Sequence, residues 1–159
     1  KDRTITKKYN AFVWGEMKEE FGTINRAIGR SGSDFRKFST GRGKRGDLRE
    51  AETYWTKIAT GFWKVPEEDR EEKVSFLEIE PKTGRTHQIR VHLSAINHPV
   101  IGDKLYAAKK PFLLGFLRLA LHSRFIEFEN LDGKKIKIEA SLPLDFQEAG
   151  RAAGFDLES

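Results

Sequence analysis

The sequence contains no cysteine, so the chain can form neither disulfides nor thiolate metal sites. No apolar run approaches the roughly 18 residues that are needed to cross a bilayer. No signal-peptide pattern opens the chain either. We therefore expect a cytoplasmic protein with no membrane partner.

Two common catalytic patterns are also absent from the sequence. The chain has no G-x-x-x-x-G-K-[ST] run, which excludes the usual Gly-rich loop for nucleotide phosphates. It has no G-x-S-x-G run, so a Ser-His-Asp triad has no local support. His87 and His92 are five residues apart, which places them on different faces of a helix, and no carboxylate or cysteine completes a metal shell. We expect no metal site.

The composition is that of one globular domain with a basic surface. Hydrophobic residues make up 38% of the 159 residues, which is enough for a core. Lys and Arg exceed Asp and Glu by 29 − 24 = 5, a balance common in RNA-binding proteins but also in many others. The sequence begins at Lys1 rather than methionine and leads straight into a strand-like pattern. We therefore expect a piece of a longer protein.

The periodicity predicts a sheet built largely from neighbouring hairpins. Alternating apolar and polar residues indicate strands, and Asp132-Gly133 is a strong hairpin-turn signal. Apolar residues recur at helical spacing from Ile89 until His98-Pro99 ends the helix. We expect an α+β fold with a mostly antiparallel mixed sheet and a few flanking helices. The expected strands are Thr4–Met17, Glu52–Trp63, Lys73–Pro81, Arg124–Glu129 and Lys134–Glu139, and the expected helices are Thr86–Asn97 and a short one after Leu142-Pro143.

Residues 29–49 are expected to form a basic flexible loop. Glycines and serines alternate there with cations, against only Asp34 and Asp47. Such a run is usually a solvated loop. It can also be a mobile arm that follows a nucleic-acid backbone, and we favour this alternative slightly. The cations that we expect to contact RNA are Arg36, Lys37, Arg42, Lys44 and Arg45.

Five hydrogen-bonding side chains stand in the six residues from Arg85 to Arg90, at the mouth of the expected helix. With Thr86 as the N-cap, His87 and Arg90 fall on one stripe opposite the apolar residues. Unpaired N–H groups and the helix dipole add positive potential, so the cluster could bind a phosphate or a carboxylate. The alternative is that these side chains only cap the helix and tie loops together. The density of donors favours a site.

These residues also carry a family resemblance that spans nearly the whole chain. The run EPKTGRTHQIRVHLSAINHPVIGDKLY resembles the signature of the RluA-type pseudouridine synthases. It is followed by LALHSRFIEF and EASLPLDF at the spacing of that family. Upstream, KKYNAFVWG resembles the family's Lys-x-Tyr-x-Ala strand, and AETYWTKI resembles the strand after its variable loop.

The resemblance implies a pseudouridine-synthase-like fold and an enzyme that isomerises uridine in RNA to pseudouridine without a cofactor. The family breaks the N-glycosidic bond, turns the uracil, and joins C5 to C1′. An aspartate is essential, an arginine pairs with it, and a tyrosine packs on the target base. By resemblance Arg90 takes the arginine role and Tyr9 the tyrosine role, while Arg85 and His87 support the site or contact RNA. We expect a monomer that acts on ribosomal or transfer RNA.

The sequence departs from the family at one important place. The catalytic aspartate of the family lies in an Arg-Leu-Asp-x-x-Thr-Ser-Gly segment, and no such segment occurs in these 159 residues. We therefore interpret residues 1–159 as part of a catalytic domain and expect this chain alone to be inactive. Two alternatives are an RNA-binding module without catalysis and a basic scaffold with no RNA role.

Overall fold

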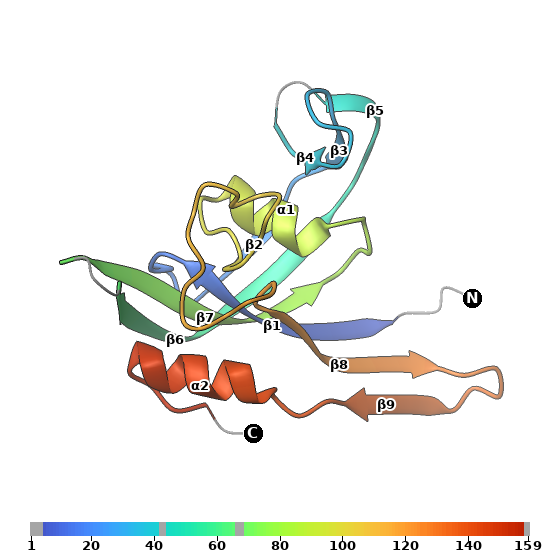
Figure 1. Cartoon of the computed structure of the whole chain (residues 1–159). Coiled ribbons are helices and arrows are strands. Elements are labelled where there is room, and N and C mark those ends of the chain that lie inside the picture. Colours follow the sequence, from blue (N-terminus) through green and yellow to red (C-terminus); the bar gives the residue numbers. More distant parts are fainter. Residues whose placement is uncertain (1–4, 42–43, 66–68, 158–159) are drawn as a thin grey trace.

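The protein, seen here as a computed structural model, is described over residues 5–41, 44–65 and 69–157 (Figure 1). Strands outnumber helices in this part of the chain, and the two helices lie on opposite sides of a large sheet (Figure 1). The elements are β1 (Thr6–Trp14), β2 (Phe21–Asn25), β3 (Ile28–Ser31), β4 (Phe38–Ser39), β5 (Lys44–Arg49), β6 (Glu52–Lys64), β7 (Glu71–Pro81), α1 (Gln88–Ala95), β8 (Leu121–Glu129), β9 (Lys135–Glu139) and α2 (Leu144–Ala153).

The large sheet has six strands in the order β2-β6-β7-β1-β8-β9, and every pairing in it is antiparallel. This arrangement confirms the predicted α+β class and the predicted hairpin between β8 and β9. Strand β2 lies at one edge of this sheet. Tyr9 of β1 lies opposite Ile79 of β7 on one side and Ser123 of β8 on the other, so it sits in the middle of the sheet.

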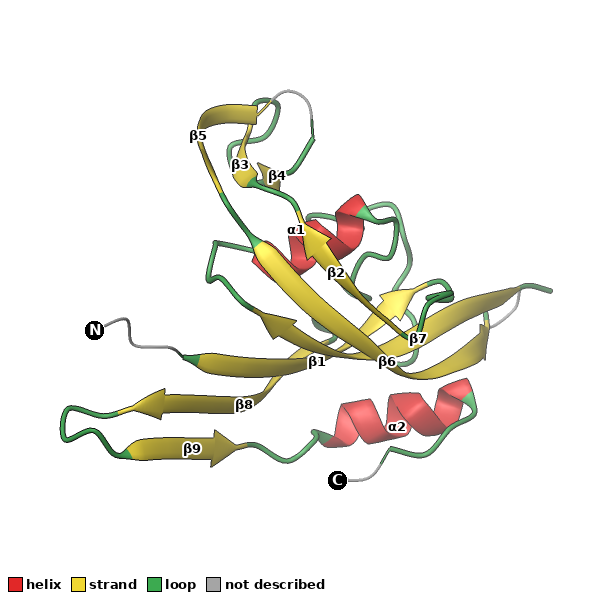
Figure 2. Cartoon of the chain, turned by 180° about the vertical axis from the view of Figure 1, so that it is seen from behind, coloured by secondary structure: helices red, strands yellow, loops and turns green. Residues whose placement is uncertain are grey.

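Both faces of the central strands are covered, because α2 packs on one side and α1 on the other (Figures 1 and 2). Phe12 and Phe76 are register partners on neighbouring strands, and both rings lie against Phe146 of α2. Each buried aromatic ring of this kind contributes about 1.5–3 kcal/mol through burial. As a result every residue from Asn10 to Trp14 is buried, irrespective of parity.

Gly61 sets how closely α2 approaches the sheet. A Cβ atom added at Gly61 would lie 2.1 Å from the backbone oxygen of Ala153 and 2.9 Å from the ring of Phe155. Backbone cannot yield to such an overlap, so any other residue here would push the end of α2 away from β6. The glycine marks a place where two backbones meet directly.

Residues 29–49, which we expected to be a basic flexible loop, contain β4, β5 and most of β3 instead. They form a separate small antiparallel sheet in the order β4-β3-β5 (Figure 1). Ile28 is buried with Ala51 and with Val91 of α1, and the backbone amide of Phe38 donates to the Tyr106 hydroxyl at 3.0 Å. A few apolar anchors therefore hold a segment whose composition is otherwise that of a loop.

Among the described residues, no helix is both long and apolar enough to span a membrane.

Candidate active site

The connection from β7 to α1 differs from the prediction in how the helix begins. We expected Thr86 to cap the helix, but α1 starts at Gln88, and His87 precedes it in the left-handed conformation with φ 56°. The side-chain oxygen of Gln88 accepts from the backbone amide of Arg85 at 3.0 Å and from the Thr83 hydroxyl at 2.7 Å. Gln88 therefore holds the residues before the helix in place, a role that we had predicted for Thr86.

Gln88 and His92 also fasten α1 to strand β6 through a buried polar network. The amide nitrogen of Gln88 donates to the Glu52 carbonyl at 2.9 Å and to the Thr53 hydroxyl at 3.0 Å. His92 Nδ1 lies 2.9 Å from that hydroxyl, and Nε2 lies 2.9 Å from the carbonyl of Arg26. Because a carbonyl can only accept, Nε2 carries the proton and Nδ1 accepts from Thr53. Gln88, one of the five side chains of the Arg85–Arg90 cluster, and His92 therefore have structural roles.

His92 is fully buried, and burial lowers its pKa below the ordinary value. The nearby Arg26 side chain acts in the same direction, against the hydrogen bond to the Arg26 carbonyl. The neutral ring matches the network, in which Nδ1 must accept a hydrogen bond.

Arg90 faces the other way and forms a doubly hydrogen-bonded ion pair with Asp103. Its Nε and Nη2 atoms donate to the two Asp103 oxygens, each at 2.7 Å. The Asp103 side chain is fully buried and the Arg90 side chain is 17% exposed. The backbone amides of Leu105 and Tyr106 donate to Asp103 as well, at 2.9 Å and 3.0 Å, and the Tyr106 ring lies 5.0 Å from the guanidinium. The carboxylate is fully engaged and the guanidinium is fixed in position.

The electrostatics of this pair follow from its contacts. Burial alone would raise the pKa of Asp103, but the hydrogen bonds from Arg90 and the two backbone amides outweigh burial and lower it. The hydrogen bond to Asp103 raises the pKa of Arg90. Both groups are therefore charged at neutral pH.

Asp103 occupies the Nε and Nη2 donors of Arg90, so a second carboxylate could pair only with the remaining end of the guanidinium. The role of Asp103 as the partner of Arg90 was not predicted from the sequence. The one signal was the spacing of Asp103 and Tyr106, which suits an aspartate that accepts from the amides of the following residues. Among the described residues Arg90 makes no hydrogen bond through Nη1, so this end of the guanidinium remains available.

Tyr9 and Arg90 line one cleft of about 190 Å³, which we call the Tyr9 cleft. Tyr9 comes from the middle of β1 and Arg90 from the first turn of α1, so the antiparallel sheet and the helix packed on it bring the two together. Of the predicted site residues, Arg85 and His87 line the same cleft. The remaining lining residues are Lys7, Pro81, Thr83, Gly84, Gln88, Ile89 and Leu121.

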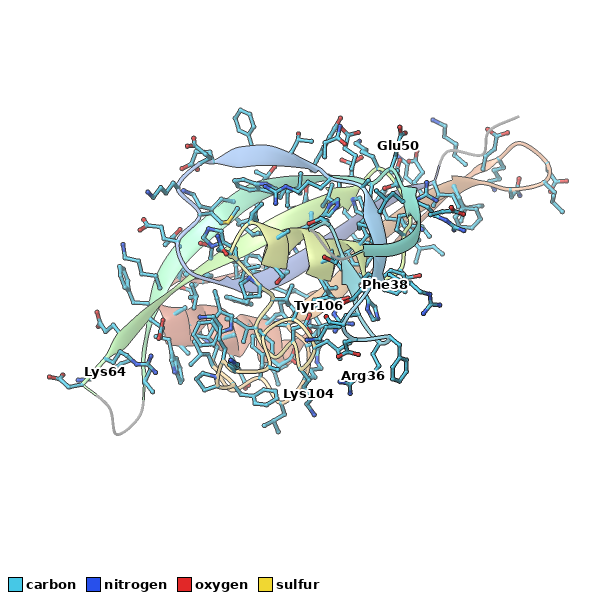
Figure 3. All side chains as sticks on the ribbon, turned by 90° about the horizontal axis from the view of Figure 1, so that it is seen from above. Arg36, Phe38, Glu50, Lys64, Lys104 and Tyr106 are labelled. Atoms are coloured by element: carbon cyan, nitrogen blue, oxygen red, sulfur yellow. The ribbon has the colours of Figure 1, made fainter. Side chains whose placement is uncertain are left out.

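His87 joins the cleft to the small sheet. Its Nδ1 atom lies 3.1 Å from the Tyr106 hydroxyl, and its ring meets both Tyr106 and Phe38 edge-on. Phe38 and Tyr106 lie close together (Figure 3). Burial, followed by the charge of Arg90, lowers the pKa of His87, so the ring is neutral near pH 7. A neutral ring can accept from Tyr106 and still donate through Nε2.

The described residues among the other predicted RNA contacts lie in or next to the small sheet. Arg36 points outward from the body of the molecule and forms two hydrogen bonds with Asp34, at 3.1 Å and 3.0 Å (Figure 3). Those hydrogen bonds lower the pKa of Asp34 to about 2. Lys37 is half-buried next to Phe38. Arg42 lies outside the described residues, and Lys44 and Arg45 lie in β5 with side chains that are outside the description.

Within residues 5–41, 44–65 and 69–157, no three His, Cys, Asp or Glu side chains are placed to hold a metal ion.

Comparison with known proteins shows which family the chain resembles. Residues 1–95 match the family described as RNA pseudouridylate synthase. An uncharacterized RNA pseudouridine synthase of Mycobacterium bovis is 36% identical over 152 residues, which cover 94% of this chain and 45% of the relative. Ribosomal large subunit pseudouridine synthase D of Zymomonas mobilis is 32% identical over 156 residues, covering 92% of this chain and 44% of the relative.

A solved structure of human RNA pseudouridylate synthase domain containing 1 is also similar. It has a TM-score of 0.78 and 26% identity, over 98% of this chain and 62% of that one. The chain thus spans less than half the length of the curated relatives that it matches.

Proposed function

This chain belongs to the RNA pseudouridylate synthase family, and we propose that the complete protein isomerises uridine in RNA to pseudouridine. The reaction we propose breaks the bond between N1 and C1′, turns the uracil within the site and joins C5 to C1′, without a cofactor. The observation that carries the proposal is the Tyr9 cleft, which is lined by both an aromatic ring and a positioned guanidinium.

Each of the two residues has a role that suits its position. An enzyme that works on a base takes it out of the stack and needs an aromatic or apolar surface to hold it. Tyr9, rigid in the centre of the sheet, offers that surface in a cleft that suits a single base rather than a larger ligand. Arg90, fixed by Asp103 through Nε and Nη2, keeps its Nη1 end available, and we propose that this end pairs with the catalytic aspartate of the family.

The residues around the cleft are proposed to contact the RNA. Arg85 and His87 line it beside Arg90, and Arg36 and Lys37, next to the small sheet, and Lys44 and Arg45, in β5, add positive charge. Arg42 is proposed as a further contact. The substrate is ribosomal or transfer RNA, and the name of the Zymomonas mobilis relative favours ribosomal RNA. We place the protein in the cytoplasm as a monomer.

The test uses the complete protein and RNA labelled with tritium at C5 of uridine, because joining C5 to C1′ releases the tritium. We expect release by the wild type and none by the Arg90→Ala variant, whose RNA affinity changes less than its turnover. The Tyr9→Phe variant keeps the ring and loses only the hydroxyl, so it separates packing from hydroxyl chemistry when compared with Tyr9→Ala. No release by the wild type on ribosomal or transfer RNA would refute the proposal.

A second candidate is an RNA-binding module without catalysis. It is favoured by the pairing of Arg90 with Asp103, which satisfies the arginine without any further carboxylate. The same experiment decides between the two, since such a module binds RNA and releases no tritium.

A further inference from the structure

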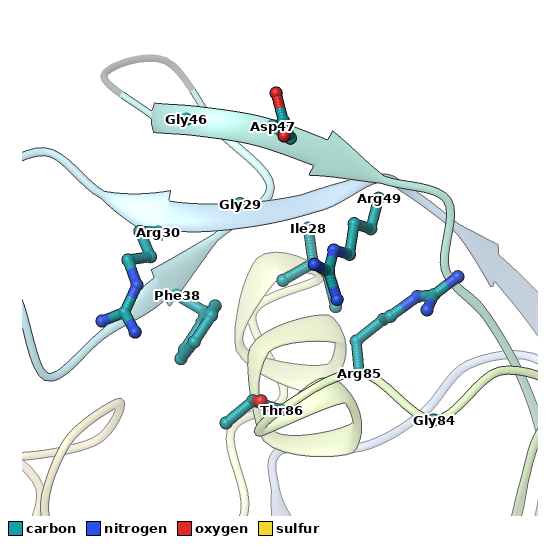
Figure 4. A pocket seen from close by; sticks show the side chains of 10 residues that line it. All are labelled: Ile28, Gly29, Arg30, Phe38, Gly46, Asp47, Arg49, Gly84, Arg85 and Thr86. Atoms are coloured by element: carbon teal, nitrogen blue, oxygen red, sulfur yellow. The ribbon is translucent and has the colours of Figure 1, made fainter.

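A second hollow lies beside the Tyr9 cleft, between the small sheet and the connection that precedes α1 (Figure 4). Its volume is about 380 Å³, within the range of roughly 300–1,000 Å³ that is usual for ligand sites. We call it the arginine pocket. It is lined by Ile28, Gly29, Arg30, Phe38, Gly46, Asp47, Arg49, Gly84, Arg85 and Thr86.

The charge around this pocket is strongly one-sided. Arg30 comes from β3, Arg49 from β5 and Arg85 from the β7–α1 connection, so three separate segments each contribute a guanidinium. Asp47 is the single acidic lining residue, and its side chain points to the opposite side of β5 (Figure 4). Three cations in one pocket repel one another unless an anion joins them.

No carboxylate neutralises these three arginines within the described part of the chain. Five other arginines do have a carboxylate partner: Arg36, Arg70, Arg90, Arg118 and Arg124. Arg30 and Arg85 are instead held by backbone carbonyls, those of Phe35 at 3.4 Å and Glu50 at 3.0 Å. Neutral acceptors of this kind orient a guanidinium and leave its charge uncompensated.

The pocket also has an apolar surface and an open backbone. The Phe38 ring lies 5.5 Å from the guanidinium carbon of Arg30, so a base or ribose could pack there beside the cation. Gly46 has φ +74° and nothing within 4 Å of the place where a Cβ would be, which leaves room for a ligand to reach the strand. Guanidinium forks match the oxygens of phosphate.

We propose that the arginine pocket binds a phosphodiester of the RNA strand next to the nucleotide that enters the Tyr9 cleft. Gly84 and Arg85 line both hollows, so a strand that crosses this connection meets the pocket on one side and the cleft on the other. The pocket contributes affinity that does not depend on sequence, and it fixes the position of the strand. This inference rests on the proposed function for the identity of the polymer.

The test measures binding of a labelled single-stranded oligouridylate to the complete protein by fluorescence anisotropy over a series of salt concentrations. Each phosphate contact contributes about 0.7 to the slope of log affinity against log salt for single strands. Because the pocket is proposed to hold one phosphodiester, we expect the double variant Arg30→Gln/Arg49→Gln to lower the slope by about 0.7 and each single variant to lower it by less. Thermal unfolding checks that all the variants remain folded.

Lys64→Gln is the matched control, because it removes one exposed positive charge at the far end of β6 (Figure 3). Twelve residues separate Lys64 from Glu52, roughly 40 Å of strand, so its slope should equal that of the wild type. Unchanged slopes for both arginine variants would overturn the proposal. A second result would also overturn it: inorganic phosphate raises the thermal stability of the wild type but not of the double variant, while the salt slopes of the two proteins are equal. The pocket would then bind a small anion and not the RNA backbone.

The outcome also separates this proposal from the proposed function. Lower slopes without tritium release by the wild type would support an RNA phosphate site in a protein with no synthase activity. Tritium release with unchanged slopes would support the synthase and refute the pocket.

Discussion

Arg90 and Asp103 form a buried ion pair with two hydrogen bonds, although one lies in helix α1 and the other in the loop that follows it. The pair fixes a guanidinium at the wall of the Tyr9 cleft and leaves one of its ends available. A second pair of the same geometry, Arg118 with Asp145, lies at the surface with side chains that are 47% and 36% exposed.

The two pairs give a matched prediction for stability. Asp103→Asn leaves the charge of Arg90 buried without a counter-charge, so we expect a loss of about 3 kcal/mol in the free energy of unfolding. Asp145→Asn breaks a solvated pair and should cost less than about 1 kcal/mol. Urea denaturation of both variants checks this, and equal losses would show that Asp103 does not hold a buried charge.

Two threonines of β6 give a second matched pair. Thr53→Val removes the hydroxyl that links Gln88 to His92, which leaves buried polar groups unpaired, and we expect a loss of about 1–3 kcal/mol in the free energy of unfolding. The buried hydroxyl of Thr60 has no partner in the described part of the chain, so Thr60→Val should be neutral or slightly stabilising. A larger loss for Thr60→Val than for Thr53→Val would contradict the network.

The buried histidine predicts a pH dependence of stability. The folded-state pKa of His92 is lowered, whereas the unfolded chain titrates near the ordinary value of 6.5. Its contribution is therefore complete above pH 6.5 and is lost as the pH falls toward the folded pKa, because the unfolded state then binds more protons. We expect the free energy of unfolding to decrease below pH 6.5 in the wild type, in part also because the pKa of His87 is lowered.

The control for this prediction is His92→Asn. This variant should be less stable at every pH but should show a shallower decrease below pH 6.5. The contribution of Asp103 does not interfere, since a lowered carboxylate pKa affects stability only below about 3.8. An unchanged slope in His92→Asn would exclude His92 as the titrating group.

A further prediction concerns the 159 residues by themselves. Their Leu-Asp pairs are Leu131-Asp132 in the β8–β9 turn and Leu144-Asp145 at the start of α2, and neither lines the Tyr9 cleft. Purified alone, this chain should release no tritium from C5-labelled uridine in RNA, whereas the complete protein should. Release by the isolated chain would mean that the proposed catalytic aspartate outside it is not required.

The sequence predicted those elements that are marked by residues next to them in the chain. Asp132-Gly133 marks the β8–β9 hairpin, and His98-Pro99 lies just beyond α1, which ends at Ala95. Residues 29–49 could not be assigned in this way, because their strands depend on distant partners. Phe38 is held by Tyr106, which is 68 residues away in the sequence.

The site was predicted in part for the same reason. The sequence brought Tyr9, Arg85, His87 and Arg90 together as candidates, and all four line one cleft. It could not show that Gln88 faces β6, because the partner, Thr53, belongs to another strand. The arginine pocket was missed because its members are spread over three segments.

Arg85 lines both the Tyr9 cleft and the arginine pocket, so binding in one site can affect binding in the other. If an RNA strand occupies both sites, the free energy of binding in one site depends on what is bound in the other. Such coupling is reciprocal. If backbone binding in the arginine pocket raises the affinity of the cleft for uracil by some factor, then uracil binding raises the affinity of the pocket for the backbone by the same factor. Selection of the right nucleotide would then begin before any bond is broken.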